Sequence, residues 1–133
     1  MIVDTSAVVA ILNAEPGWQV LEEALRSAPS PKMSAATYVE LGAVVDSRRD
    51  PSLSRRVDQL LDAWGVTVVA VTPADADVAR AAYRDFGRGS GHSARLNYGD
   101  CFAYALARSS REPLLFVGDD FGHTDVEVVA LDA

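Results

Sequence analysis

The sequence of 133 residues has one cysteine, one lysine, two histidines and no long apolar run. The single cysteine, Cys101, cannot form an internal disulfide bond, which excludes a disulfide-stabilised secreted scaffold. No apolar run approaches the roughly 20 residues of a transmembrane helix, and no basic segment precedes an apolar stretch near Met1. We therefore expect a soluble, cytoplasmic protein with no membrane partner, folded as one domain over residues 1–133.

Positive charge is also scarce, because 12 Lys and Arg residues face 19 Asp and Glu residues and the formal net charge is −7. This total is unfavourable for binding a polyanion by charge alone. The charges are unevenly spread: segment 48–95 holds eight arginines and six acids, whereas the rest holds four basic and thirteen acidic residues. The excess acid outside this segment indicates either a solvated surface or a metal-binding cluster.

Short apolar runs alternate with helical patterns, which predicts an α/β fold with a parallel β-sheet flanked by helices on both faces. The expected strands are residues 1–3, 66–71, 114–117 and 126–131. The β-branched composition of 66–71 predicts a strand covered on both faces. The expected helices are residues 7–13, 35–49, 52–64 and 73–87, one between Pro16 and Pro29, and one capped by Asn97. The glycine-rich segment 88–93 predicts a loop.

Acidic residues follow two of the expected strands directly. Asp4 comes after the first strand, and Asp119 follows the strand at 114–117. Ligands of parallel α/β sheets bind beyond the carboxyl ends of the strands. We therefore expect these two acids to converge at that edge of the sheet.

Two further acids stand out by position. Glu40 lies within a largely apolar helical segment, where an acid must be paired, protonated or metal-bound. Asp100 lies in the first turn of a helix. Structural explanations compete with a functional one, because Asp4 and Asp100 can serve as helix caps and Asp119-Asp120 can form an ordinary turn.

Carboxylates brought together repel and raise one another's pKa values, so their convergence is stable only if cations neutralise them. Oxygen ligands without Cys or His favour Mg²⁺ or Mn²⁺ over Zn²⁺. Such a site suits phosphodiester cleavage by a metal-activated water.

Four blocks of sequence carry a family resemblance: MIVDTSA at residues 1–7, the helical segment around Glu40, GHSARLNYGDCFAYALA at 91–107, and LLFVGDDF at 114–121. Together they resemble the PIN-domain ribonucleases, specifically the VapC-type toxins of bacterial toxin–antitoxin pairs. The similarity runs through nearly the whole chain, and the segment LNYGDC is its most distinctive part.

The resemblance implies a PIN-like sheet, Mg²⁺- or Mn²⁺-dependent cleavage of structured RNA such as transfer or ribosomal RNA, a homodimer, and inhibition by a VapB-type antitoxin. It assigns Asp4, Glu40 and Asp100 as catalytic, metal-binding acids and Ser6 as a supporting hydroxyl. It assigns the fourth acid to Asp119, with neighbouring Asp120 as a supporting residue or as the ligand itself. The choice stays open because the Thr that precedes this acid in many relatives is absent here.

Two other functions compete with this interpretation. A phosphoacceptor signalling domain has similar strand-end acids, but it needs a lysine beyond a late strand, and the one lysine is Lys32. A catalytically degenerate PIN domain would act only as a binding module, and the three matched acids argue against it. Neither His92 nor His123 has the context of a Ser-His-Asp triad, so we expect both in surface loops. The arginines at 48, 49, 55 and 56 could track an RNA backbone, but arginines at helix ends are more often solvated, which is what we expect here.

Overall fold

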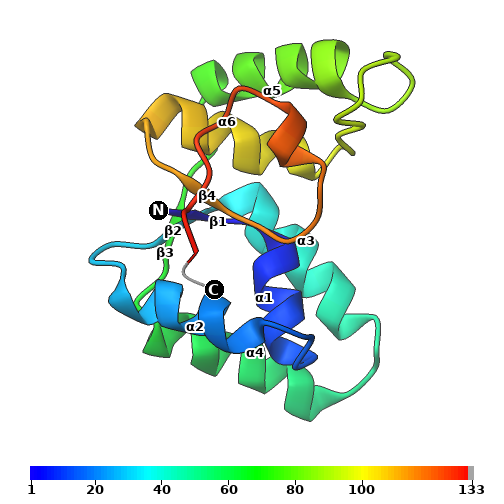
Figure 1. The fold of residues 1–133 in the computed structure, drawn as a ribbon. Helices are drawn as coiled ribbons and strands as arrows, with labels where there is room; N and C mark the ends of the chain where they lie inside the picture. The colour runs from blue at the N-terminus through cyan, green and yellow to red at the C-terminus, as the bar shows by residue number, and fades with distance from the viewer. Residues whose placement is uncertain (132–133) are drawn as a thin grey trace.

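The structure, a computed structural model, describes residues 1–131, in which six α-helices surround a four-stranded parallel sheet (Figure 1). The elements follow in the order β1 (Ile2–Val3), α1 (Thr5–Leu12), α2 (Trp18–Ser27), β2 (Lys32–Ser34), α3 (Ala35–Asp46), α4 (Pro51–Ala63), β3 (Thr67–Val69), α5 (Pro73–Phe86), α6 (Asp100–Ser110), β4 (Leu114–Leu115) and the 3-10 helix η1 (Phe121–His123). Over the described residues, no helix combines the length and apolar character of a membrane span. The α/β class expected from the sequence is confirmed.

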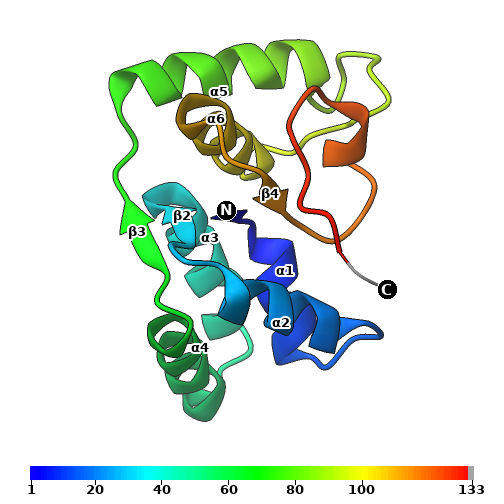
Figure 2. The same ribbon diagram turned by 60° about the vertical axis from the view of Figure 1, so that its left-hand side comes forward.

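The sheet separates two hydrophobic layers. Its strand order is β3-β2-β1-β4, and all pairs are parallel. Successive side chains of a strand point to opposite faces. Val3 and Leu115 accordingly join the core that α1 to α4 build, while Ile2 and Leu114 join the core under α5 and α6. Helices thus cover both faces, as predicted, and Figure 2 shows α5 and α6 across the sheet from α2 and α4.

The helices begin where the sequence supplies capping residues. Asp4, Ser34 and Asp50 each accept a hydrogen bond from the backbone N–H two residues later, at the starts of α1, α3 and α4. Thr72 forms a capping box with Asp75 at the start of α5. Because β1 and β2 run directly into α1 and α3, helix N-termini gather at the carboxyl end of the sheet.

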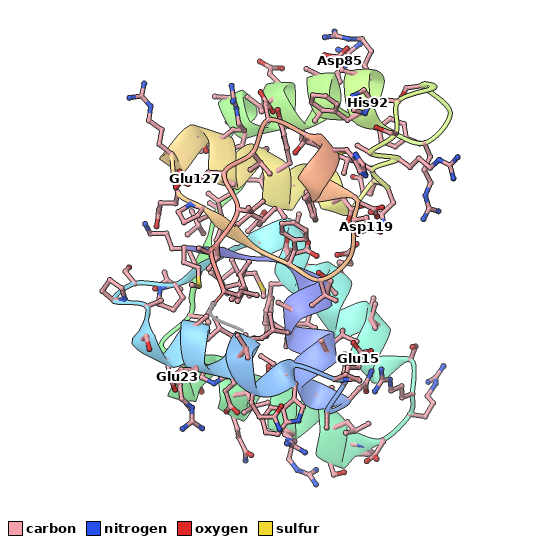
Figure 3. The ribbon with its side chains drawn as sticks, viewed as in Figure 1. Glu15, Glu23, Asp85, His92, Asp119 and Glu127 are labelled. Carbon is pink, nitrogen blue, oxygen red and sulfur yellow. The ribbon has the colours of Figure 1, made fainter. Side chains whose placement is uncertain are left out.

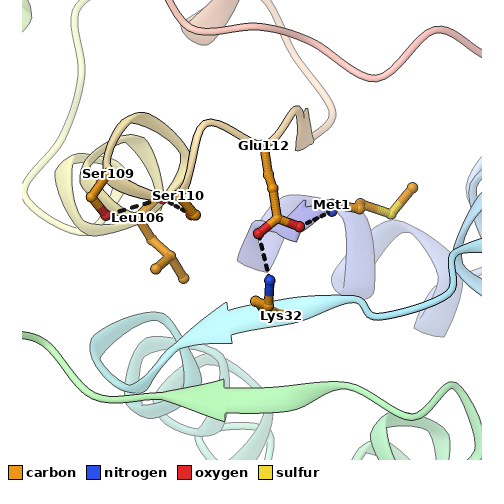
Figure 4. A network of polar contacts seen from close by, with 6 residues as sticks. All are labelled: Met1, Lys32, Leu106, Ser109, Ser110 and Glu112. Carbon is orange, nitrogen blue, oxygen red and sulfur yellow. Dashed lines mark hydrogen bonds and ion pairs between the residues drawn. The ribbon is translucent and has the colours of Figure 1, made fainter.

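At the opposite end of the strands, Glu112 links the amino ends of β1 and β2 (Figure 4). The N-terminal amine of Met1 donates to Glu112 Oε1 at 2.6 Å, and Lys32 Nζ donates to Glu112 Oε2 at 2.5 Å. The bond from Lys32 and that from the N-terminus hold the pKa of Glu112 below its usual value. The one lysine of the sequence therefore has a structural contact remote from the strand-end acids.

The strands in the middle of the chain differ from the prediction in two respects. The strand β2 was not predicted, because its three residues include Lys32 and Ser34 and show no apolar run. The predicted strand at 66–71 is shorter, and it lies at the edge of the sheet with Val68 44% exposed. A β-branched run is compatible with an edge position as well as with a covered one, so composition alone did not distinguish them.

The predicted last strand, 126–131, was also wrong. Within the described part of that segment, Val128 forms one isolated parallel bridge with Leu114. Leu114 N–H donates to the carbonyl of Glu127 at 2.8 Å, and Val129 N–H donates to the carbonyl of Leu114 at 3.0 Å. The segment therefore covers the outer side of β4 without extending the sheet. The predicted helix 35–49 ends earlier, at Asp46.

Candidate active site

Asp4 lies at the junction of β1 and α1 and is 3% exposed. Its Oδ2 accepts hydrogen bonds from the backbone N–H of Ser6 at 3.0 Å and from Ser6 Oγ at 2.6 Å. Its other oxygen, Oδ1, is buried and has no hydrogen-bond partner among residues 1–131. Burial is the main cause that raises the pKa of Asp4, and the negative charge of Glu40 adds to it.

The Ser6 hydroxyl connects two strand ends. It donates to Asp4 and also accepts a hydrogen bond from the backbone N–H of Val117 at 3.0 Å, on the segment after β4. The predicted supporting residue Ser6 is thus placed between the first acid and the loop that carries Asp119 and Asp120.

Glu40 approaches the same region from α3. Thr5 Oγ1 donates to Glu40 Oε1 at 2.6 Å, across 35 residues of sequence. The carboxylate also packs against the backbone of Gly99, where the Cβ of any other residue would overlap Glu40 Oε2. Thr5 and Gly99 therefore position Glu40, a role that the sequence analysis missed. Their adjacency to Asp4 and Asp100 in the sequence was the available signal.

Asp100 begins α6 and exchanges hydrogen bonds with Asn97. Its backbone N–H donates to Asn97 Oδ1 at 2.8 Å, and its Oδ2 accepts the backbone N–H of Asn97 at 2.9 Å. Burial chiefly, and then the charges of Asp4, Asp120 and Glu40, raise the pKa of Asp100 to about 7. The carboxyls from four parts of the chain thus act on one another.

Asp119 and Asp120 both lie on the exposed loop between β4 and η1, where Figure 3 labels Asp119. The charge of Asp120 is among those that raise the pKa of Asp100. The structure therefore brings Asp4, Glu40, Asp100 and Asp120 into one electrostatic group.

Three of the candidate acids share a hydrogen-bonding pattern. Asp4, Glu40 and Asp100 each use one carboxylate oxygen as an acceptor of a bond from Ser6, Thr5 or Asn97. The second oxygen of each has no hydrogen-bond donor in the part of the chain that the structure describes. As the side chains stand, no three His, Cys, Asp or Glu residues among 1–131 are close enough to hold one metal ion.

The residues fit a hard divalent cation by their chemistry. The orphaned Oδ1 of Asp4 is a buried acceptor that costs free energy until a donor or a cation reaches it. The donors are all oxygen atoms, which Mg²⁺ and Mn²⁺ prefer. A bound cation would also relieve the mutual repulsion that raises the pKa of Asp100.

Comparison with known proteins identifies the family to which the chain belongs. The family model described as PIN domain matches residues 1–127. The crystal structure of VapC20 from Mycobacterium tuberculosis, a toxin that cleaves the sarcin-ricin loop, matches with a TM-score of 0.73 at 19% identity, covering 96% of this chain and 97% of VapC20. A toxin–antitoxin complex from Klebsiella pneumoniae matches with a TM-score of 0.70 at 16% identity, covering 96% and 95% of the two chains. The chain therefore belongs to the PIN-domain family.

A curated relative is much more similar in sequence. The ribonuclease VapC42 of Mycobacterium tuberculosis is 60% identical over 126 residues, which cover 95% of this chain and 96% of VapC42. Within the PIN-domain family, the chain is one of the VapC ribonuclease toxins.

Removing the charge of Asp100 tests the electrostatics of the site. Because its folded pKa lies above the ordinary aspartate value of 3.8, the folded protein binds more protons than the unfolded chain between about pH 4 and 7, and its stability falls as pH rises through this window. Asp100→Asn keeps the carbonyl acceptor and removes this loss. In EDTA, we expect the variant to gain at least about 1 kcal/mol over wild type between pH 5 and 7.5, measured by urea unfolding. Parallel pH profiles of the two proteins would contradict this.

A methyl group at Gly99 tests how Glu40 is held. Gly99→Ala should displace the Glu40 carboxylate while the fold persists, because the obstacle is the end of a flexible side chain. We expect RNA cleavage to fall by about 10- to 100-fold, as for loss of an outer-shell partner of a metal ligand, with a nearly unchanged melting temperature. The matched control is Gly122→Ala, whose added methyl group meets nothing within 4 Å. Full activity of Gly99→Ala, or equal losses in both variants, would contradict the assignment.

Proposed function

We propose that this VapC ribonuclease is an endoribonuclease that depends on Mg²⁺ or Mn²⁺ held by Asp4, Glu40 and Asp100, with the fourth acid supplied by Asp119 or Asp120. The observation that carries the proposal is the shared pattern of three carboxylates, each fixed through one oxygen with the other left without a donor. The orphaned Oδ1 of Asp4 is the strongest case. When bound, the cation supplies Lewis acidity, lowers the pKa of a water molecule and stabilises charge on the leaving oxygen.

The protein side chains prepare this site by positioning. Ser6 fixes the rotamer of Asp4, Thr5 fixes Glu40, and the exchange with Asn97 fixes Asp100. No side chain is required to attack the RNA, so water is the proposed nucleophile. Holding the acids before substrate arrives reduces the reorganisation needed at the moment of reaction.

The proposed substrate is a loop of transfer or ribosomal RNA. Support comes from VapC20, a protein of the same fold that cleaves the sarcin-ricin loop. Sequence-specific RNA recognition usually targets loops, because their unstacked bases and backbone are accessible there.

Charge removal at Asp4 tests the proposed function. Asp4→Asn should leave the helix cap intact and reduce metal-dependent RNA cleavage by more than about 100-fold, beyond the cost of losing an outer-shell residue. Cleavage sites are mapped by sequencing RNA 5′ ends after brief induction, with the exposed Asp77→Asn as the matched control. Full cleavage by folded Asp4→Asn would refute the mechanism. A folded wild type that never cleaves RNA with Mg²⁺ or Mn²⁺ would instead indicate the degenerate binding module.

The same assay identifies the fourth acid. Asp120 acts electrostatically on Asp100, so Asp120→Asn should lower cleavage more than Asp119→Asn does. The reverse order would return the role to Asp119, as the sequence analysis first assigned it.

We also propose that a VapB-type antitoxin binds the groove between α3 and α4. This groove has a volume of about 410 Å³, and its lining includes Tyr38 and the largely exposed Val39, next to Glu40. Asp46 and Asp58 contribute acidic groups, which suit a partner segment with basic residues. The toxin–antitoxin complex of similar fold supports such a partner, and the resemblance also implies a homodimer.

A charge placed in this groove tests the partner assignment. Val39→Asp, made in the Asp4→Asn background to prevent toxicity, should reduce co-purification of the neighbouring gene product by at least about tenfold, because it buries an unpaired carboxylate. The control is Val128→Asp, at a residue 46% exposed on the far segment. Light scattering on the toxin alone reports the expected homodimer. Unchanged co-purification combined with loss of the dimer would assign the groove to a second copy of the chain.

A further inference from the structure

A cavity of about 970 Å³ lies between the loop after α5 and the loop after β4. Its lining includes Arg88, His92, Arg95 and Asp120. Asp120 lies on the same loop as Val117, whose backbone N–H donates to the Ser6 hydroxyl that holds Asp4, so the cavity adjoins the carboxylate group of the candidate active site. Figure 3 shows His92 on the loop that follows α5.

The two arginines of this cavity have no acidic partner among the described residues. Among residues 1–131, neither Arg88 nor Arg95 forms an ion pair, whereas Arg26, Arg84 and Arg108 do. A guanidinium presents a planar fork of N–H donors that matches the oxygens of a phosphate. Two guanidinium groups beside the candidate acids can therefore bind the phosphates of a polyanion whose chain continues beyond those acids.

The backbone holds both arginines in place. Arg88 N–H donates to the carbonyl of Leu96 at 2.9 Å, and Leu96 N–H donates to the carbonyl of Phe86 at 2.8 Å, which closes the base of the loop. Arg95 lies between Ala94 and Leu96, both fully buried, and has a positive φ of 52°. Its anchored neighbours leave its exposed side chain on the outside, at the cavity.

His92 lies on a loop, as the sequence analysis expected, and it is half-buried and held in one orientation. Its Nδ1 accepts the backbone N–H of Ala94 at 3.0 Å, and its ring packs edge-on against Phe86 with centroids 4.9 Å apart. With Nδ1 used as an acceptor, the proton of the neutral ring is on Nε2, which remains a donor.

We propose that this cavity, lined by Arg88, His92, Arg95 and Asp120, binds backbone phosphates of the RNA next to the one that is cleaved. This inference rests on the proposed function and adds a binding site to it. Arg88 and Arg95 neutralise neighbouring phosphates, and His92 donates a hydrogen bond from Nε2. All three are positioning residues, which keep the scissile phosphate at the carboxylates.

The first test measures RNA binding without cleavage. Fluorescence anisotropy with a labelled RNA hairpin of about 20 nucleotides is recorded on the Asp4→Asn protein over about 50 to 200 mM KCl. Adding Arg88→Gln and Arg95→Gln should weaken binding about tenfold and reduce the slope of log K against log salt by about 1.4, because each lost single-strand phosphate contact removes about 0.7. Arg55→Gln with Arg56→Gln makes the same charge change on α4 and should leave the slope unchanged.

The second test separates contact from structure at His92. An Asn side chain at 92 offers an amide oxygen in place of Nδ1 for the Ala94 N–H, but it lacks the Nε2 donor. In the otherwise wild-type enzyme, His92→Asn should raise KM several-fold with little change in kcat, and His92→Ala should do so while also lowering the melting temperature. Wild-type KM in His92→Asn would show that the ring only supports the loop, and would overturn its proposed contact.

The outcomes distinguish this inference from the proposed function. Unchanged affinity and slope for the Arg88 and Arg95 double variant overturn the cavity proposal, whether or not the wild type cleaves RNA. Loss of antitoxin binding with unchanged RNA binding overturns it too, and assigns the cavity to an acidic protein segment. Arginine-dependent binding in a protein that never cleaves RNA supports the cavity and refutes the proposed activity.

Discussion

The candidate site depends on carboxylates that accept hydrogen bonds through one oxygen and not through the other. Asp4, Glu40 and Asp100 lie at the start of α1, within α3 and at the start of α6, and each is anchored through one carboxylate oxygen by a single residue. The anchored oxygen keeps the side chain in place despite the repulsion of the others, and the second oxygen of Asp4 is buried with no donor among residues 1–131. Burial then penalises the negative charge, so an incoming cation gains more here than at a solvated acid.

Structural and chemical roles coincide in the same side chains. Asp4 caps α1, so the capping explanation of this acid is correct. Asp100 is the first residue of α6, whose N-cap is Gly99, and it exchanges hydrogen bonds with Asn97 instead. Capping does not compete with a role in the site, since it uses one carboxylate oxygen and fixes the direction of the other. Strands that lead directly into capped helices thereby deliver acids to one edge of the sheet.

The sequence was sufficient to predict features that depend on local patterns. Asp4 follows an apolar run and precedes a helix, so its position at a strand end could be inferred from seven residues. The strand β2 and the edge position of β3 could not, because both are decided by pairing with distant segments. Likewise, the contact of Thr5 with Glu40 spans 35 residues, and nothing in the local sequence of either residue encodes it.

The identity of the fourth acid could not be predicted from local sequence either. Asp119 and Asp120 are chemically identical neighbours, so no local pattern distinguishes them. The course of the backbone between β4 and η1 brings the charge of Asp120 close enough to raise the pKa of Asp100. The loop 88–93 is a comparable case: its glycines predicted a turn, whereas the cavity that Arg88 and Arg95 form with Asp120 depends on a segment 25 residues or more away.

The Glu40 carboxylate fills the space that a side chain at position 99 would need, although the two residues are 59 positions apart in the sequence. A bulkier residue at position 99 is compatible with the fold only when the acid at position 40 is shorter or turned away. The two positions should therefore covary as a pair across natural VapC chains. In protein engineering, a shorter aspartate at 40 is the compensating change to combine with an alanine at 99.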